Sequence, residues 1–313
     1  MTAPPFRWVF LSPHFWPTWL GVALLRLLCL LPIPALVRLG EGIGWAFGRL
    51  ARERRHITRV NLRSCFPDQD EAQVERTVDA HFRALGAGIF EACLAWWASD
   101  QRLRRRCEIV GLEHLERAKA GGHGVLLLTG HFTTLELGAR YLLVAGTPFH
   151  AMYRPIKNPL MDWLMHRWRS AIAKLPALPR DELRPLVRAL REGRAVWYGP
   201  DQTLDRRDGV FVPFFGKLAS TASGPAWLSL ATRAPIVFCT CARAADGRLE
   251  LRMLPALEPV GDAGDPEAVR SLTAGHTALL ETAVRERPAQ WFWLHKRWKT
   301  RPAVSSATLP TEG

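Results

Sequence analysis

The chain has 313 residues, of which 48% are hydrophobic and 23% charged, so it is long enough to bury the core of one large domain or two small ones. This composition, together with the lack of low-complexity tracts and internal repeats, excludes fibrous and wholly disordered proteins. Basic residues outnumber acidic ones by 42 to 29, and the net charge of +13 favours an anionic partner: nucleic acid, anionic lipid or an acidic protein.

The N-terminal segment is apolar over nearly the thickness of a bilayer. From Trp16 to Gly40 it reads WPTWLGVALLRLLCLLPIPALVRLG, which approaches the roughly 20 residues that a membrane span needs. We therefore predict an N-terminal membrane helix and assign residues 1–40 to a membrane anchor segment. Arg26 favours a helix that snorkels or lies partly in the interface, so residues 16–37 either span the membrane or lie at its surface. A buried core helix is the alternative.

Arginines follow this apolar segment. Because positive charge flanks membrane segments on the cytoplasmic side, the pattern places the remaining chain on the cytoplasmic side of the membrane, against anionic headgroups. The basic residues also follow the apolar run rather than precede it, which disfavours a cleaved signal peptide. The arginines are Arg49, Arg52, Arg54, Arg55, Arg59 and Arg63.

Helical and strand patterns alternate through the rest of the chain, which predicts an α/β fold with helices covering both faces of a mixed sheet. A turn at Asp246–Gly247 favours a hairpin between the last two strands. The predicted helices are 70–98, 134–145, 158–173, 180–193, one that begins near Thr221, and 266–287; the predicted strands are 107–110, 125–128, 149–153, 194–199, 235–242 and 248–255. A long loop is expected after Pro200. We assign residues 41–302 to one α/β domain and 303–313 to a flexible polar tail.

His131 is placed where ligands gather in such sheets. It follows the strand 125–128 and Gly130, at a carboxyl end of the predicted sheet. Glu136 lies five residues further on, about 140° away on a continuous helix, so the two side chains can meet only if His131 precedes the helix. In that arrangement the carboxylate would orient the imidazole and leave its other nitrogen free as a general base.

A capping box is the alternative role for Glu136. Thr133 fits an N-cap, which makes Glu136 the N3 residue that folds back over the helix start. The two roles are compatible, because a carboxylate folded toward the N-cap also points toward His131. No Ser or Cys lies in a nucleophile elbow beside His131, so a base there would activate a substrate hydroxyl for direct transfer.

The cysteine and histidine spacing does not fit a metal site. The six cysteines form no C-x-x-C pair and the ten histidines form no H-E-x-x-H motif. We therefore expect no metal, and no cofactor.

Several sequence blocks in a fixed order resemble one family. They are NLRSCFP at 61–67, HFTTLELGAR from His131, YRPIKNPLMDWL from Tyr153, VWYGPDQ up to Gln202, VFVPFFG from Val210, and WLHKRWKTRP up to Pro302. In this order the blocks resemble the lauroyl- and myristoyl-type late acyltransferases of lipid A biosynthesis, within the H-x4-D/E glycerolipid acyltransferases. The segment 174–180 is unusually rich in proline for this family.

The resemblance implies a membrane-bound O-acyltransferase at the cytoplasmic face of the inner membrane, with residues 41–302 as its acyltransferase domain. Its donor would be a fatty acyl chain on the acidic acyl carrier protein, its acceptor a hydroxyacyl chain of an anionic lipid A precursor, and nucleic acid would not be a partner. By resemblance, His131 and Glu136 are the catalytic pair.

The same resemblance places Tyr153, Arg154, Asp201 and Gln202 in the substrate groove. A salt bridge from Arg154 to Asp201 or Glu136, and an Asx turn at Asp201, remain structural alternatives. The basic run from Lys296 to Arg301 is either a docking face or a solvated surface.

Two other functions stay open. The acceptor could be another lipid, such as an ornithine lipid, a lysophospholipid or a mannosylated lipid. The chain could instead be a non-enzymatic protein that binds anionic membranes.

Overall fold

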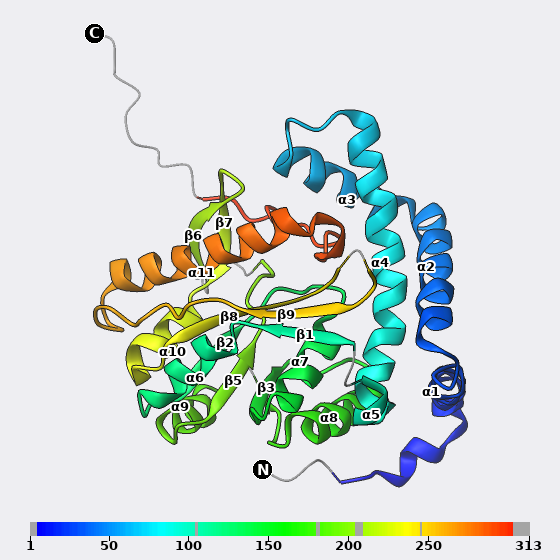
Figure 1. Ribbon diagram of the computed structural model, residues 1–313, viewed down its shortest axis with the longest axis horizontal. Coiled ribbons are helices and arrows are strands. Elements are labelled where there is room, and N and C mark those ends of the chain that lie inside the picture. The colour runs from blue at the N-terminus through cyan, green and yellow to red at the C-terminus, as the bar shows by residue number, and fades with distance from the viewer. Residues whose placement is uncertain (1–4, 104–105, 180–181, 204–208, 245, 303–313) are drawn as a thin grey trace.

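The computed structural model describes residues 5–103, 106–179, 182–203, 209–244 and 246–302, and Figure 1 shows how their elements are arranged. A central sheet has the strand order β1-β9-β8-β2-β5-β3-β4, and β6 and β7 form a separate hairpin. The strands are β1 (Cys107–Val110), β2 (Val125–Leu128), β3 (Phe149–Tyr153), β4 (Leu178–Pro179), β5 (Ala195–Tyr198), β6 (Gly209–Phe214), β7 (Lys217–Ala222), β8 (Ile236–Arg243) and β9 (Leu249–Met253).

Helices flank this sheet. They are α1 (Trp16–Leu28), α2 (Ile33–Leu50), α3 (Arg52–Cys65), α4 (Glu71–Trp97), α5 (Asp100–Leu103), α6 (Leu112–Ala120), α7 (Leu135–Val144), α8 (Pro159–Ala173), α9 (Leu183–Arg191), α10 (Gly224–Thr232) and α11 (Pro266–Glu286). Three short 3-10 turns are η1 (Trp8–Leu11), η2 (Pro13–Phe15) and η3 (Pro288–Gln290).

The sheet is mixed, as the sequence predicts. The strands β8, β2, β5, β3 and β4 run parallel, whereas β9 pairs antiparallel with β8 across the expected turn at Asp246–Gly247. Alternate residues of β2 enter different cores: Leu126 and Leu128 pack with α9, α10 and α11, and Val125 and Leu127 pack with α6, α7 and α8. All four are fully buried, which explains the uninterrupted apolar run of β2.

The β6–β7 hairpin replaces most of the loop predicted after Pro200. Its turn residues Phe215 and Gly216 both have positive φ, 52° and 69°, as a two-residue hairpin turn requires. Phenylalanine is not a residue that signals such a turn, and Phe215 is held there by packing against Trp293 and Phe66. Because β7 extends to Ala222, the next helix begins at Gly224 and not near Thr221.

The predicted N-terminal membrane helix is not found. Residues 16–37 are divided between α1 and α2, because Pro32 and Pro34 lack the N–H groups that would continue one helix. The 13 residues of α1 rise about 20 Å, less than the roughly 30 Å of a bilayer core. No helix among the described ranges is both long and apolar enough to cross a membrane.

Glycines let α2 pack closely along α4, as Figure 1 shows at one side of the sheet. Gly40, Gly44 and Gly48 lie one helical turn apart on the buried face of α2. A Cβ built on Gly44 would lie 2.0 Å from the carbonyl oxygen of Phe82, and one on Gly86 would lie 2.0 Å from the carbonyl oxygen of Gly40. The two backbones therefore touch without side chains between them.

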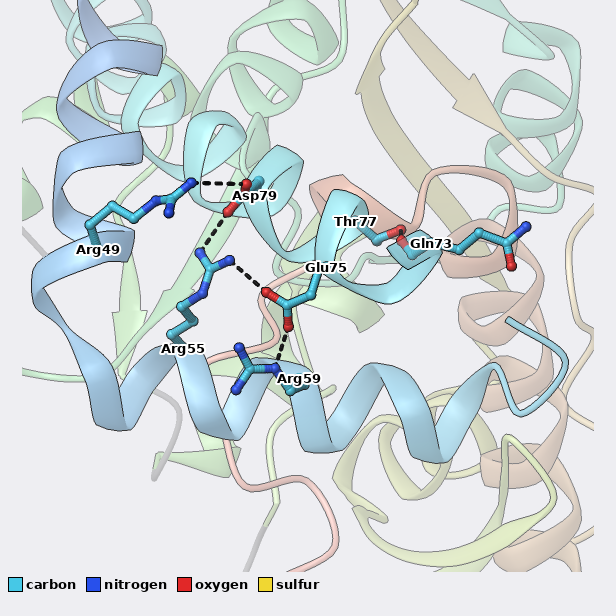
Figure 2. A network of polar contacts seen from close by, with 7 residues as sticks. All are labelled: Arg49, Arg55, Arg59, Gln73, Glu75, Thr77 and Asp79. Atoms are coloured by element: carbon cyan, nitrogen blue, oxygen red, sulfur yellow. Dashed lines mark hydrogen bonds and ion pairs between the residues drawn. The ribbon is translucent and has the colours of Figure 1, made fainter. Parts of the chain in front are cut away.

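Ion pairs fasten α3 to α4 (Figure 2). Arg55 bonds Glu75 at 2.7 Å and Asp79 at 2.6 Å, and Arg59 also bonds Glu75. Hydrogen bonds from Arg59 and Arg55 lower the pKa of Glu75 to about 2. Arg63 pairs with Glu71 in the same way. Several arginines that the sequence assigns to lipid headgroups are thus engaged within the protein.

We expect Gly44→Ala to destabilise the protein, because the new methyl group would meet α4 backbone that cannot move aside. Overpacking of this kind costs about 1–3 kcal/mol. Gly42→Ala is the matched control on the exposed side of the same helix, where nothing lies within 4 Å of the new Cβ. Thermal unfolding should show a lower Tm for the first variant only; equal Tm values would contradict the close packing.

Candidate active site

A cavity of about 330 Å³ lies at the carboxyl ends of β2, β3 and β5, beneath α7 and α8. Its walls are largely apolar, and Phe149, Ile172 and Trp197 are among the buried residues that form them. All six predicted site residues belong to this region: His131, Glu136, Tyr153, Arg154 and Gln202 line the cavity, and Asp201 lies directly behind His131. The site is thus located where the carboxyl ends of parallel strands collect ligands.

The carboxylate partner of His131 is Asp201. His131 follows β2 and Asp201 follows β5, and these strands are parallel neighbours with Leu128 opposite Tyr198. The Nδ1 atom of His131 is hydrogen-bonded to Oδ1 of Asp201, while Oδ2 accepts the backbone N–H of His131 at 2.7 Å. Gly199 leaves room for the imidazole, since a Cβ there would lie 3.2 Å from its Cε1.

The two side chains shift each other's pKa values in opposite directions. Burial alone would raise the pKa of Asp201, but the charge of His131 and hydrogen bonds from His131 and Trp291 lower it to about 2. Burial likewise lowers the pKa of His131, yet the Asp201 carboxylate outweighs it and raises that pKa above its ordinary value of 6.5. Asp201 is therefore a carboxylate at neutral pH, and it stabilises the protonated imidazole.

The geometry leaves one imidazole nitrogen for chemistry. Because Nδ1 is engaged by Asp201, Nε2 is available on a side chain that keeps 35% of its surface exposed at the cavity. The carboxylate fixes the tautomer and supports the imidazolium, as in other His–carboxylate pairs. Among the described residues that line the cavity there is no Ser, Thr or Cys to form a covalent intermediate.

Glu136 lies in the same cavity, but its hydrogen-bond partners are Arg169 and Trp96 and not His131, as the sequence had predicted for this carboxylate. Its Oε1 accepts from Nε of Arg169 at 3.0 Å, and its Oε2 accepts from the indole of Trp96 at 3.1 Å. The capping box is also absent: Thr134 is the N-cap and makes no side-chain cap bond. The hydroxyl of Thr133 accepts a hydrogen bond from Arg243 instead, 3.3 Å away.

Arg169 is a site residue that sequence reasoning missed. It comes from α8 and lines the cavity beside Glu136. No local signal distinguishes it, because arginine is abundant in this chain and α8 carries other charged residues. Only the packing of α8 against α7 brings its guanidinium to the cavity.

The structural alternative for Arg154 does not hold. Asp201 pairs with His131 and Glu136 pairs with Arg169, so neither carboxylate forms a salt bridge with Arg154. Arg154 is exposed at the cavity, directly after β3. Tyr153 is half-buried, and burial raises the pKa of its phenol.

Comparison with known proteins identifies the family. The family of bacterial lipid A biosynthesis acyltransferases matches residues 3–300. This chain belongs to that family. It is 37% identical to the lipid A biosynthesis lauroyltransferase of Escherichia coli (strain K12), over 96% of both chains. Identity is 35% to the palmitoleoyltransferase of that organism, over 95% of this chain and 96% of the relative, and 27% to its myristoyltransferase, over 95% and 91%.

Membership of the lipid A acyltransferase family shows that the chain is an enzyme that transfers acyl groups. It excludes the alternative of a non-enzymatic protein that binds anionic membranes. The cavity beside the His131–Asp201 pair is largely apolar, which is the character of a site that holds an acyl chain.

We expect Asp201→Asn to lower the pKa of His131, because the substitution removes the partner charge and leaves the burial. Glu136→Gln should lower that pKa by less, since Glu136 is already paired with Arg169. Both effects can be measured from the titration of the His131 imidazole by NMR, with the signal assigned in a His131→Ala variant. A larger decrease in Glu136→Gln would make Glu136 the true partner.

Proposed function

We propose that this protein moves a fatty acyl chain from acyl carrier protein to the hydroxyl of a hydroxyacyl chain on a lipid A precursor. The observation that carries the proposal is the His131–Asp201 pair beside a largely apolar cavity, in a chain of the lipid A acyltransferase family. The names of its relatives support the acceptor class: lauroyl-, palmitoleoyl- and myristoyltransferases of lipid A biosynthesis.

His131 acts as the general base in this mechanism. Its Nε2 removes the proton from the acceptor hydroxyl while the oxygen attacks the thioester carbonyl carbon. The C–S bond then breaks, and the leaving thiolate takes the proton back from the imidazolium. Asp201 keeps Nδ1 protonated throughout and stabilises the transient positive charge. Because His131 must be neutral to accept the proton, activity should rise with pH through its raised pKa.

The two arginines of the cavity have different roles. Arg169 is held by Glu136, so it forms a fixed positive wall beside the reacting groups. Arg154 is exposed and has no ion-pair partner within the described ranges. Its forked donors suit an anionic group of either substrate, which two parallel hydrogen bonds would hold in place. The same geometry would serve another anionic lipid acceptor, which is the second candidate function.

The test is acyl transfer from loaded acyl carrier protein to a tetra-acylated lipid A precursor, followed by mass spectrometry of the product. His131→Ala should lower kcat by roughly 10²–10⁴-fold, the usual contribution of a general base. His123→Ala is the control, a histidine in the loop before β2 that is outside the cavity. If the His131→Ala variant turns over at nearly the wild-type rate, His131 is not the general base. Transfer to a lysophospholipid or an ornithine lipid alone would favour the second candidate.

We also propose that the N-terminal helices lie in the surface of the inner membrane, on its cytoplasmic side. The exposed apolar side chains of α1 support this: Leu20, Leu24 and Leu27 are 71%, 57% and 63% exposed and follow one helical face. Trp8 and Trp16 are exposed beside them, as interfacial aromatic residues are. Exposed apolar patches of this kind mark membrane or protein contacts.

Vesicle flotation tests this location. Leu20→Asp combined with Leu24→Asp should strongly reduce the fraction that floats with phosphatidylglycerol vesicles, because two charges would enter the apolar face. Val260→Asp is the matched control, since Val260 is 80% exposed in the loop before α11. Undiminished flotation of the double variant would contradict interfacial binding through α1.

A further inference from the structure

The segment 290–297, which we call the C-terminal clamp, joins the loop that carries His131. The backbone N–H of Thr133 donates to the carbonyl of Gln290 at 2.8 Å, and that of Phe292 donates to the carbonyl of His131 at 3.0 Å. Phe132 and Trp291 form an antiparallel bridge between these two bonds. The clamp therefore continues the backbone pairing of the loop after β2.

The same clamp also joins the loop that carries Asp201. The backbone N–H of Thr203 donates to Nε2 of His295 at 2.9 Å, and the Thr203 hydroxyl donates to the carbonyl of Arg297. Arg297 is fully buried and donates to the β6–β7 hairpin, at the carbonyl of Ser220 and the hydroxyl of Thr221. Both loops of the catalytic pair are thus fixed to one short segment.

Trp291 lies where the two sets of bonds meet. Its indole N–H donates to Oδ2 of Asp201 at 2.7 Å, and its side chain is almost wholly buried. The ring packs edge-on against Trp293, 4.6 Å between centroids, and against Phe214, 5.6 Å. A ring fixed on both sides holds its N–H donor in one direction.

We propose that Trp291 is a positioning residue for the His131–Asp201 pair, an inference that rests on the proposed function. Its indole N–H holds the Asp201 carboxylate in the plane that the imidazole needs, and takes up part of the negative charge on Oδ2. Trp291 does not line the cavity, so it acts only through Asp201.

The charge on Oδ2 determines the direction of the expected effect. In Trp291→Phe the carboxylate stays beside His131, because the backbone N–H of His131 still binds Oδ2. With one donor fewer, the carboxylate attracts the imidazole proton more strongly, so the pKa of His131 should rise. The other charged or titratable groups around the pair stay unchanged: Glu136 of α7, Arg169 of α8, Arg154 after β3, and His295 and Arg297 of the clamp.

The experiment compares Trp291→Phe with Trp19→Phe in the full chain. Trp19 is half-buried in α1, and its indole donates to the carbonyl of Phe10 at 2.8 Å and not to the pair. Trp291→Phe should lower kcat roughly ten-fold, the size expected for one hydrogen bond to a charged group, with KM unchanged. The acid limb of its pH–rate profile and the NMR titration of His131 should both move to higher pH.

The outcomes separate this inference from the proposed function. A His131 titration that is unchanged in Trp291→Phe, or that moves equally in Trp19→Phe, would overturn the positioning role. If Trp291→Phe does not fold, the NMR chemical shift of the Trp291 indole N–H in the wild-type protein provides the test. This chemical shift should change with pH at the midpoint of the His131 titration. A chemical shift that does not change there would overturn the proposal. A wild-type protein that transfers no acyl chain would defeat the proposed function, while the titrations would still test the position of Trp291.

Discussion

The hydrogen bonds between His131 and Asp201 join two loops that are 70 residues apart in the chain. They form because β2 and β5 are parallel neighbours whose ends lie in register, so the first residues beyond each strand meet at one edge of the sheet. A carboxylate with 2% of its side chain exposed would be costly without partners. The imidazole, a backbone N–H and an indole supply them. This contact sets the orientation of Nε2 at the cavity, and Trp291 of the clamp bonds the same carboxylate.

Local sequence patterns were sufficient to locate His131 but not its carboxylate partner. The short apolar strand before Gly130 and the helix after it placed His131 at a carboxyl end of the sheet, and the structure confirms that position. The carboxylate that bonds His131 was not identified, because Glu136 is near in sequence, whereas Asp201 becomes near only through strand order. Strand order is a long-range property that sequence periodicity does not carry. Arg169 was missed because the packing of α8 against α7 is likewise a long-range property.

The helices and strands were predicted better than the contacts between them. The long helix before residue 98 and the helix after Asp265 match α4 and α11 closely, since both begin at an aspartate N-cap. The β6–β7 hairpin was missed because tertiary packing, and not a turn residue, holds Phe215 at positive φ. The arginines after α2 have partners that the sequence did not indicate. Their charge was assigned to lipid headgroups, and the structure pairs several of them with acidic residues of α4 (Figure 2).

The position of the clamp near the end of the chain has a consequence for biosynthesis. Protein chains are made from the N-terminus, and their early segments fold first. The apolar helices α1 and α2 and their partner α4 therefore emerge long before residues 290–297. A growing chain can engage its surroundings through those helices while the loops after β2 and β5 still lack the bonds that hold them together. The bonds that fix the loops of His131 and Asp201 to this segment are therefore formed last, and a chain that ends before residue 290 lacks them.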